Sequence, residues 1–100
     1  MSLFELTGRV ALVTGGARGL GEASCRALAR LGAVIVLSDI DAEAASATAD
    51  RLAAETGATV LPRGCDVTDP DDVDRLVGGL IEELGRLDIL VNNAGIHRRV

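Results

Sequence analysis

The chain has 100 residues, of which 48% are hydrophobic, and a formal net charge of −5 at pH 7. This length suits one compact domain and excludes two. The ten basic residues are all arginines and form no extended basic run, so neither nucleic acid nor an anionic membrane surface is an expected partner. Only 1% of the residues are aromatic, so the core must consist of Val, Leu, Ile and Ala, as in parallel sheets covered by helices.

The chain lacks the sequence signals of several other protein classes. Cys25 and Cys65 lie far apart and outside any CxxC or Cys/His cluster, so we expect small buried residues and no metal site or disulfide. Residues 1–7 have no secretory-signal pattern, and no apolar run approaches the length of a membrane span. We therefore expect a cytoplasmic protein.

Strand-like and helix-like segments alternate along the chain. Short β-branched or apolar runs predict strands over 9–14, 33–38, 59–65 and 87–91. Between them, apolar residues at helical spacing predict three helices, with Asp41 and Asp69 as N-caps of the second and third. Glycines at 32, 57 and 85 should end these helices. In the first helix, the spacing predicts a buried face made of Leu20, Ala23, Ala27, Leu28 and Leu31.

This alternation predicts an α/β fold, a Rossmann-type doubly wound parallel sheet whose βαβαβαβ half has the strand order 3-2-1-4. The first and fourth strands are neighbours in that order. Their carboxyl ends, at Thr14-Gly15 and Asn92-Asn93, would then flank the crevice in which such sheets bind ligands.

A glycine-rich turn follows the first predicted strand. Glycines at 15, 19 and 21 allow a tight turn and a close approach of the backbone to a pyrophosphate, and the helix that begins near Gly19 offers free N–H groups. The spacing is Gly-x-x-x-Gly-x-Gly rather than Gly-x-Gly-x-x-Gly, and no Gly-Lys-Ser/Thr follows, which excludes a Walker loop.

Acidic residues end the second and third predicted strands. Asp39, followed by Ile40, stands 18 residues after Gly21, where a carboxylate can accept hydrogen bonds from the adenosine ribose. The alternative, a helix cap, fits Asp41 better. Asp66, followed by Val67, fits two interpretations equally well: a contact to adenine, or a turn residue before the Asp69 cap.

After the fourth strand comes Asn92-Asn93-Ala94-Gly95, which suits a close meeting of backbone and ligand but by itself is also compatible with an ordinary turn. Taken together, these features resemble the short-chain dehydrogenase/reductase family over nearly the whole chain. The matching elements are Thr14-Gly15-x-x-x-Gly19-x-Gly21, Asp66-Val67 and Asp88-x-Leu90-Val91-Asn92-Asn93-Ala94-Gly95.

The resemblance implies an oxidoreductase that transfers a hydride between a nicotinamide cofactor and a secondary alcohol or ketone, usually as a homotetramer. It also implies pyrophosphate contacts at Arg18, Gly19 and Leu20, adenine contacts at Asp66 and Val67, and a cofactor wall formed by Asn93, Ala94 and Gly95. We expect NAD rather than NADP, because a 2′-phosphate beside Asp39 would cost about 1–4 kcal/mol of like-charge repulsion. Arg18 would favour NADP instead, since its guanidinium can reach a 2′-phosphate.

Members of the family use a catalytic Ser and a Tyr-x-x-x-Lys, but this chain contains no Tyr and no Lys. We therefore expect residues 1–100 to be the N-terminal, cofactor-binding half of a longer single-domain enzyme, with no catalytic residue among them. A stand-alone dinucleotide-binding module without catalysis is the alternative, and a methyltransferase fits the glycine spacing less well. His97, the only histidine, is expected in a loop at the rim of the site, and a catalytic role is the alternative.

The end of the sequence bears on the substrate. Ile96-His97-Arg98-Arg99 leads away from the predicted cofactor wall, and two guanidiniums there could bind a carboxylate or phosphate. This segment is similar to sugar-acid dehydrogenases of the gluconate type, and Arg98 is similar to an arginine of 3-oxoacyl carrier-protein reductases. Both resemblances imply an anionic small-molecule substrate. The alternative is that Arg98 and Arg99 form salt bridges with the second half of the enzyme or with a neighbouring subunit.

Overall fold

The computed structural model describes residues 5–93, in which four strands and three helices alternate. Every strand begins and ends within two residues of its predicted bounds. The elements are β1 (Val10–Thr14), α1 (Gly19–Arg30), β2 (Val34–Asp39), α2 (Ala42–Thr56), β3 (Val60–Gly64), α3 (Pro70–Leu84) and β4 (Ile89–Asn92).

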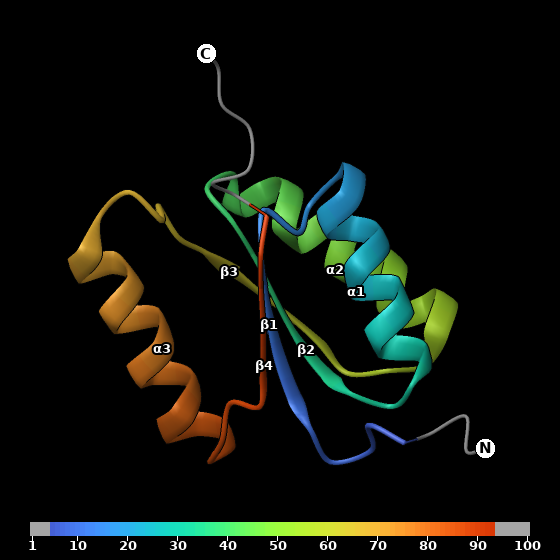
Figure 1. Ribbon diagram of the computed structural model, residues 1–100. Helices are drawn as coiled ribbons and strands as arrows, with labels where there is room; N and C mark the ends of the chain where they lie inside the picture. Colours follow the sequence, from blue (N-terminus) through green and yellow to red (C-terminus); the bar gives the residue numbers. More distant parts are fainter. Residues whose placement is uncertain (1–4, 94–100) are drawn as a thin grey trace.

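The four strands form one parallel sheet in the order β3-β2-β1-β4, as predicted. In register, Thr14 at the end of β1 lies opposite Ser38 of β2 and Asn92 of β4. The carboxyl ends of the three strands therefore meet at one edge, which is the upper edge in Figure 1. β3 lies at the opposite side of the sheet, where Pro62, which has no N–H, is tolerated.

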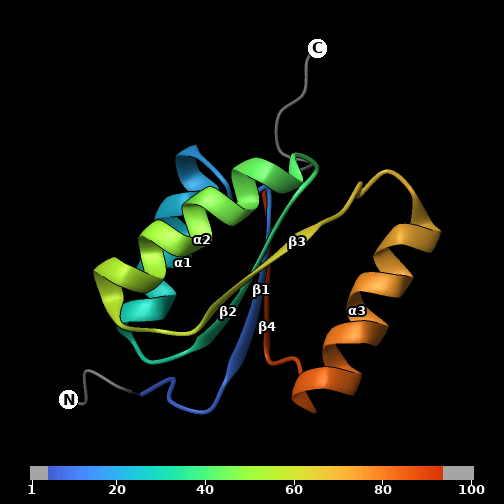
Figure 2. The ribbon, with the colours of Figure 1, turned by 180° about the vertical axis from the view of Figure 1, so that it is seen from behind.

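Helices cover both faces of the sheet. α1 and α2 lie side by side on one face and α3 lies alone on the other (Figures 1 and 2). β1 is buried along its whole length because side chains from both faces cover it. The core under α1 and α2 combines large strand residues with mostly small helix residues; its main members are Ala11, Val13, Ile35, Leu37, Cys25, Ala29, Ala45, Ala49 and Leu52. The core under α3 is smaller and consists mainly of Val10, Leu12, Val36 and Leu80.

The buried face of α1 differs from the prediction. Its buried residues are the small Gly21, Cys25 and Ala29, four residues apart. Leu20 of the predicted face is 74% exposed, and Ala23 and Ala27 are exposed as well. The predicted face was wrong at these three positions, because the helix packs closely against the sheet through its smallest side chains, whereas Leu28 is half-buried and packs against the core. Cys25 and Cys65 are both buried, as expected, and both are free thiols.

The ends of α2 and α3 follow the predicted capping. Asp41 accepts a hydrogen bond from the Ala44 amide, and Asp69 accepts one from the Asp71 amide, each at 3.0 Å. Both helices end at a glycine in the left-handed region, Gly57 and Gly85. None of the helices among residues 5–93 is long and apolar enough to span a membrane.

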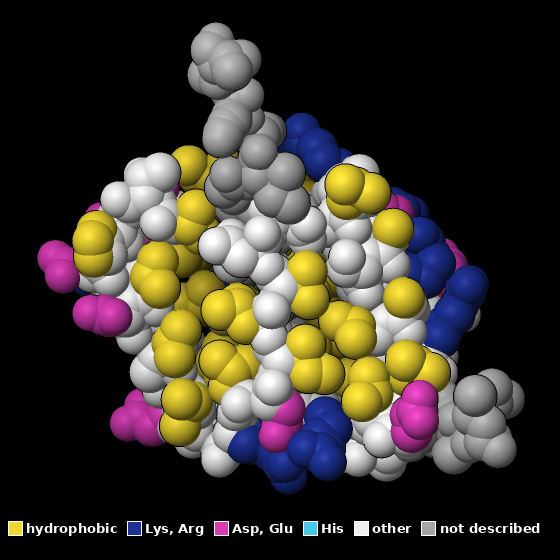
Figure 3. Space-filling view, viewed as in Figure 1, with side chains coloured by type: hydrophobic (Ala, Val, Ile, Leu, Met, Phe, Trp, Pro, Cys, Tyr) yellow, Lys and Arg dark blue, Asp and Glu magenta, His cyan; other side chains and the backbone are white. Residues whose placement is uncertain are grey.

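β4 is an edge strand with an open apolar face. Leu90 is 60% exposed, and Ile81 on the neighbouring α3 is 45% exposed. In Figure 3, hydrophobic side chains gather on the face of the molecule between α3 and α1. A row of unpaired strand groups beside exposed leucine is a surface that other parts of a protein usually cover.

Asp88 joins the start of β4 to the start of β1. One of its carboxylate oxygens accepts hydrogen bonds from the Val10 amide and from Arg86, both at 2.8 Å. The other oxygen accepts a second bond from Arg86, and Arg9 lies 3.7 Å away. The Arg86 guanidinium and the Val10 amide lower the pKa of Asp88 to about 2.

We predict that Asp88→Asn makes the free energy of unfolding less dependent on pH in the acid range. Because the pKa of Asp88 is lower in the folded state, its contribution to stability is fully present above about pH 4 and is lost as the pH falls toward 2. Denaturant unfolding of the full-length protein from pH 7 to pH 2.5 measures this loss. The control is Asp74→Asn, an exposed carboxylate of α3. If the free energy of unfolding falls equally steeply for wild type and Asp88→Asn between pH 4 and 2.5, the lowered pKa of Asp88 is contradicted.

Candidate dinucleotide site

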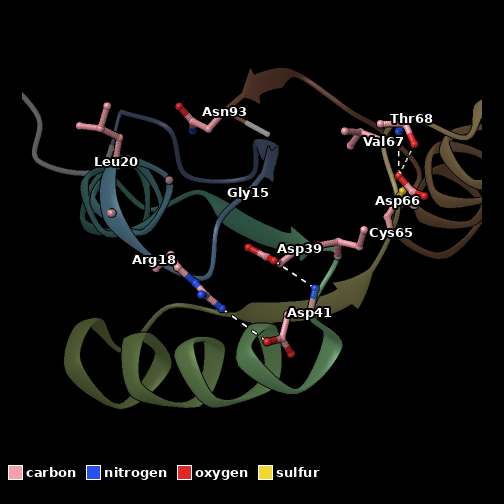
Figure 4. Close-up of a pocket in the computed structure, with 13 residues that line it drawn as sticks. Gly15, Arg18, Leu20, Asp39, Asp41, Cys65, Asp66, Val67, Thr68 and Asn93 are labelled. Carbon is pink, nitrogen blue, oxygen red and sulfur yellow. Dashed lines mark hydrogen bonds and ion pairs between the residues drawn. The ribbon is translucent and has the colours of Figure 1, made fainter. Parts of the chain in front are cut away.

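An open cleft of about 640 Å³ lies at the carboxyl ends of the strands. It is lined by all ten of the predicted site residues that fall within residues 5–93 (Figure 4). Ala94 and Gly95, like His97, Arg98 and Arg99, lie outside the described residues. The lining consists of Gly15, Arg18, Gly19, Leu20, Gly21, Asp39, Ile40, Asp66, Val67 and Asn93, together with Asp41, Cys65 and Thr68, which were not predicted.

The glycine-rich turn brings bare backbone to the floor of the cleft. Gly15 and Gly19 have φ of +62° and +59°, in the left-handed region that favours glycine. A β-carbon at Gly21 would overlap the carbonyl oxygen of Gly15, so the first turn of α1 packs directly on the turn that precedes it. The left-handed backbone thus explains the glycines at 15 and 19, and the close approach explains the glycine at 21.

The N-terminus of α1 differs from those of the other two helices. Aspartate side chains cap α2 and α3, whereas Arg18 at the N-cap of α1 makes no capping hydrogen bond. The amides of the first turn of α1 are therefore open to an external acceptor, and the positive end of the helix dipole favours an anion. Because Gly19, Leu20 and Gly21 all line the cleft, an anionic group bound there would meet these amides.

The Asp39 carboxylate lies beside this turn, at the end of β2. Its Oδ2 accepts a hydrogen bond from the Ala17 amide at 3.2 Å, and its Oδ1 accepts one from the Asp41 amide at 3.1 Å. A carboxylate offers about four lone-pair directions, so each oxygen keeps an acceptor site after these bonds. Asp39 is thus fixed by the backbone and still able to accept hydrogen bonds from a diol.

The charges at this end of the cleft are predominantly negative. The Arg18 guanidinium lies 3.5 Å from the Asp41 carboxylate, and both side chains are more than half exposed (Figure 4). One guanidinium therefore faces two carboxylates, Asp39 and Asp41. Solvent screening makes the exposed pair weak, so Arg18 is free to turn elsewhere.

Asp66 serves the turn after β3 and also lines the cleft. Its Oδ1 accepts hydrogen bonds from the Thr68 amide at 2.9 Å and from the Thr68 hydroxyl at 2.6 Å. These bonds lower the pKa of Asp66, so the carboxylate is ionised at neutral pH. Its Oδ2 makes no hydrogen bond within residues 5–93 and remains an acceptor. The two interpretations of Asp66 are therefore compatible, and the turn holds the side chain at the cleft.

Thr14 joins β1 to the Asn92-Asn93 pair. Its hydroxyl donates to the Asn92 side-chain oxygen at 2.7 Å, and the Asn93 amide donates to the Thr14 carbonyl at 3.3 Å. The side-chain nitrogen of Asn93 is buried and has no hydrogen-bond partner among residues 5–93. Buried polar groups are normally paired, so within the described residues this nitrogen is a donor without an acceptor beside the cleft.

The unpredicted lining residues are sequence neighbours of predicted ones. Asp41 follows Ile40, whereas Cys65 and Thr68 flank the Asp66-Val67 pair. Loops at the carboxyl ends of strands contribute several consecutive residues to a crevice, and this general rule is the signal that could have identified them. Burial raises the pKa of the Cys65 thiol, so it lies at the cleft as a neutral, small side chain.

Comparison with known proteins agrees with this geometry. The family model described as short chain dehydrogenase matches residues 9–100. Sorbitol dehydrogenase of Cereibacter sphaeroides is 46% identical over 92% of the chain, and gluconate 5-dehydrogenase of Gluconobacter oxydans is 43% identical over 97%. The chain spans 34% and 38% of the lengths of these two relatives.

Solved structures of the same family match the fold. A short chain dehydrogenase from Mycobacterium smegmatis superimposes with a TM-score of 0.88 at 39% identity, over 99% of this chain and 42% of that one. An active-site complex of Pseudomonas aeruginosa RhlG with NADP gives 0.84 at 43% identity, over 93% of this chain and 37% of that one. With its glycine turn, its strand order and its Asn-Asn pair in place, this chain belongs to the short-chain dehydrogenase family.

Proposed function

We propose that this chain is the dinucleotide-binding part of an NAD(H)-dependent short-chain oxidoreductase acting on a secondary alcohol or ketone. The observation that carries the proposal is the Asp39 carboxylate, held at the cleft beside an uncapped helix N-terminus. When bound, the nicotinamide would accept or donate the hydride. The residues of this chain would bind and orient the cofactor. A homo-oligomer, a tetramer by resemblance to the family, is part of the proposal.

The pyrophosphate would lie at the turn and the start of α1. Gly19 leaves open space where a β-carbon would stand, Gly21 lets the first turn of α1 pack on Gly15, and the open amides of that turn provide donors. Arg18 is exposed and only weakly paired, so its guanidinium could reach a phosphate oxygen.

The adenosine would lie between the ends of β2 and β3. Asp39 would accept hydrogen bonds from the ribose hydroxyls, and the open oxygen of Asp66 would accept one from the adenine amino group. Ile40 is 73% exposed in the cleft, and Val67 also lines it, so these two side chains would cover the adenine ring. Asn93, followed by Ala94 and Gly95, would form the wall toward the nicotinamide.

The negative charge around Asp39 favours NAD over NADP. A 2′-phosphate would lie against the carboxylate that the turn holds in place, with Arg18 as the cation nearest to compensate. Repulsion of about 1–4 kcal/mol corresponds to a preference of about tenfold to a thousandfold. The RhlG structure holds NADP, so a relative of this chain binds the phosphorylated cofactor, and we propose that residues such as these determine the choice in this chain.

We predict that Asp39→Asn narrows the preference for NAD over NADP by about tenfold or more, because the repelling charge is removed while the size is kept. Calorimetric titration of the full-length protein with each cofactor measures both Kd values. The control is Asp50→Asn, an exposed carboxylate of α2 away from the cleft, which should leave the ratio unchanged. Equal or tighter binding of NADP by the wild-type protein would refute the assignment.

A second prediction concerns the close approach at Gly21. Gly21→Ala would force the start of α1 away from Gly15, which should raise the Kd for NAD about tenfold or more and destabilise the protein by about 1–3 kcal/mol. Gly78→Ala is the matched control: a β-carbon there meets open space on α3, so stability should rise slightly and binding stay constant. Wild-type affinity in Gly21→Ala would mean that the turn does not contact the cofactor.

Catalysis would depend on residues outside this chain, since it has no Tyr or Lys. We infer that residues 1–100 belong to a longer single-domain enzyme. The uncovered β4 edge with its exposed Leu90 supports this inference, as does the greater length of the curated relatives. No observation on the described residues favours a stand-alone binding module.

For the substrate we propose a small anionic or polyhydroxylated molecule, in line with the sorbitol and gluconate dehydrogenases among the relatives. If Arg98 and Arg99 bind its anionic group, Arg98→Gln and Arg99→Gln should raise the KM for anionic substrates by about tenfold and leave the Kd of NAD unchanged. Steady-state kinetics of the full-length enzyme checks this. An unaltered KM, with a loss of assembly alone, would leave the arginines a structural role only.

A further inference from the structure

We propose that Thr48, in the middle of α2, is a positioning residue that holds Asp39 through Ala17 and so sharpens the preference for NAD. The inference rests on the proposed function of Asp39. Thr48 does not line the cleft, and neither its neighbours in the sequence nor any motif singles it out. Its contacts in the folded protein do.

The Thr48 hydroxyl makes a long-range hydrogen bond in the core. The side chain is 3% exposed, and its hydroxyl donates to the Ala17 carbonyl at 2.7 Å, across 31 residues of sequence. The Thr48 hydroxyl oxygen also accepts a hydrogen bond from the Arg51 guanidinium at 3.1 Å, so its own proton is available for the Ala17 carbonyl. Arg51 also donates to Glu22 in the first turn of α1 at 2.9 Å, so the bond is part of a link between α1 and α2.

Another threonine of the same helix provides an internal comparison. Thr56 donates to the Leu52 carbonyl, four residues earlier in α2, at 2.7 Å, which is the usual arrangement for a helical threonine. Thr48 instead turns its hydroxyl out of the helix, toward the glycine-rich turn. The other buried residues of α2 are apolar: Ala45, Ala49 and Leu52. A single hydroxyl on this apolar face therefore has a specific partner, the backbone of the turn.

Ala17 transmits this contact to Asp39. Its carbonyl accepts from Thr48 and its amide donates to the Asp39 carboxylate, so the residue is fixed on both sides of its Cα. The second donor to Asp39 is the amide of Asp41, the N-cap of α2. Both hydrogen bonds that orient the carboxylate are thus anchored on α2, one directly and one through Thr48. Without the hydrogen bond from Thr48, the Ala17 amide would hold the Asp39 carboxylate less firmly, and the Asp41 amide would be its one firmly held donor.

The consequence for the cofactor follows from geometry. A carboxylate held by two donors presents its remaining lone pairs in fixed directions, which favours a ribose diol and maximises repulsion of a 2′-phosphate. Removing the Thr48 hydroxyl should loosen Asp39. NAD would then bind less tightly, while NADP would lose little because the repelling charge could move aside.

The test compares Thr48→Val and Thr48→Ser with Thr56→Val in the full-length protein. We expect Thr48→Val to raise the Kd for NAD about three- to tenfold and to narrow the NAD/NADP ratio by a similar factor. Thr48→Ser keeps the hydroxyl, so its Kd values for NAD and NADP should stay within about twofold of those of the wild type.

Thr56→Val is the control: it loses its helical hydrogen bond and should lower the Tm of the free protein without changing either Kd. The kcat at saturating NAD should be unchanged in all three, because Thr48 touches no reacting group. If valine at 48 prevents folding, Thr48→Ala removes the hydroxyl without placing a methyl against Ala17.

Two results would overturn the inference. In one, Thr48→Val, or Thr48→Ala in its place, lowers the Tm but keeps the wild-type Kd values and ratio. In the other, Thr56→Val weakens binding as much as the Thr48 variant does. Asp39→Asn, measured alongside, separates the two proposals. If Asp39→Asn changes the ratio of the Kd values for NAD and NADP and the Thr48 variants do not, only the role of Thr48 is overturned. If neither Asp39→Asn nor the Thr48 variants change this ratio, the ribose role of Asp39 is overturned, and the inference about Thr48 with it.

Discussion

β1 is buried along its length and pairs in parallel with β2 on one side and β4 on the other. This central pairing determines where everything else in the site lies. Because parallel strands end at the same edge, Gly15, Asp39 and Asn93 reach one cleft although they are distant in sequence. Thr14 tightens this junction through its hydrogen bond to Asn92, and Asp88 secures the opposite end of the same pair of strands.

On that frame, the three helices play different parts. α2 and α3 satisfy their own first amides through aspartate caps. Each also binds the loop before it, since the Asp41 amide donates to Asp39 and the Asp66 amide donates to Asp72. α1 has no such cap, and its close packing at Gly21 keeps its first turn next to the glycine-rich backbone. The open donors of α1 are suited to an anionic group and the fixed carboxylate of Asp39 is suited to hydroxyl donors, and in our proposal they would receive the pyrophosphate and the ribose of a dinucleotide.

Local patterns in the sequence were sufficient for the fold and for most of the residues that line the cleft. The apolar runs at β1 and β2, the caps at Asp41 and Asp69 and the terminal glycines are short-range signals, and the strand order followed from the rules of connection. The buried face of α1 could not be predicted, because close packing selected Gly21, Cys25 and Ala29 over the larger Leu20. Thr48 was also beyond local reasoning, since its partner Ala17 lies 31 residues away and becomes its neighbour only after folding.

The central claim is that the ribose of a bound dinucleotide lies on Asp39 while its pyrophosphate lies on the first turn of α1. A crystal structure of the full-length protein with NAD tests this most directly. Our account predicts ribose hydroxyls within hydrogen-bond distance of the Asp39 carboxylate and pyrophosphate oxygens within that distance of the amides of Gly19, Leu20 or Gly21. A cofactor bound elsewhere, or one whose ribose leaves Asp39 without a contact, would contradict it.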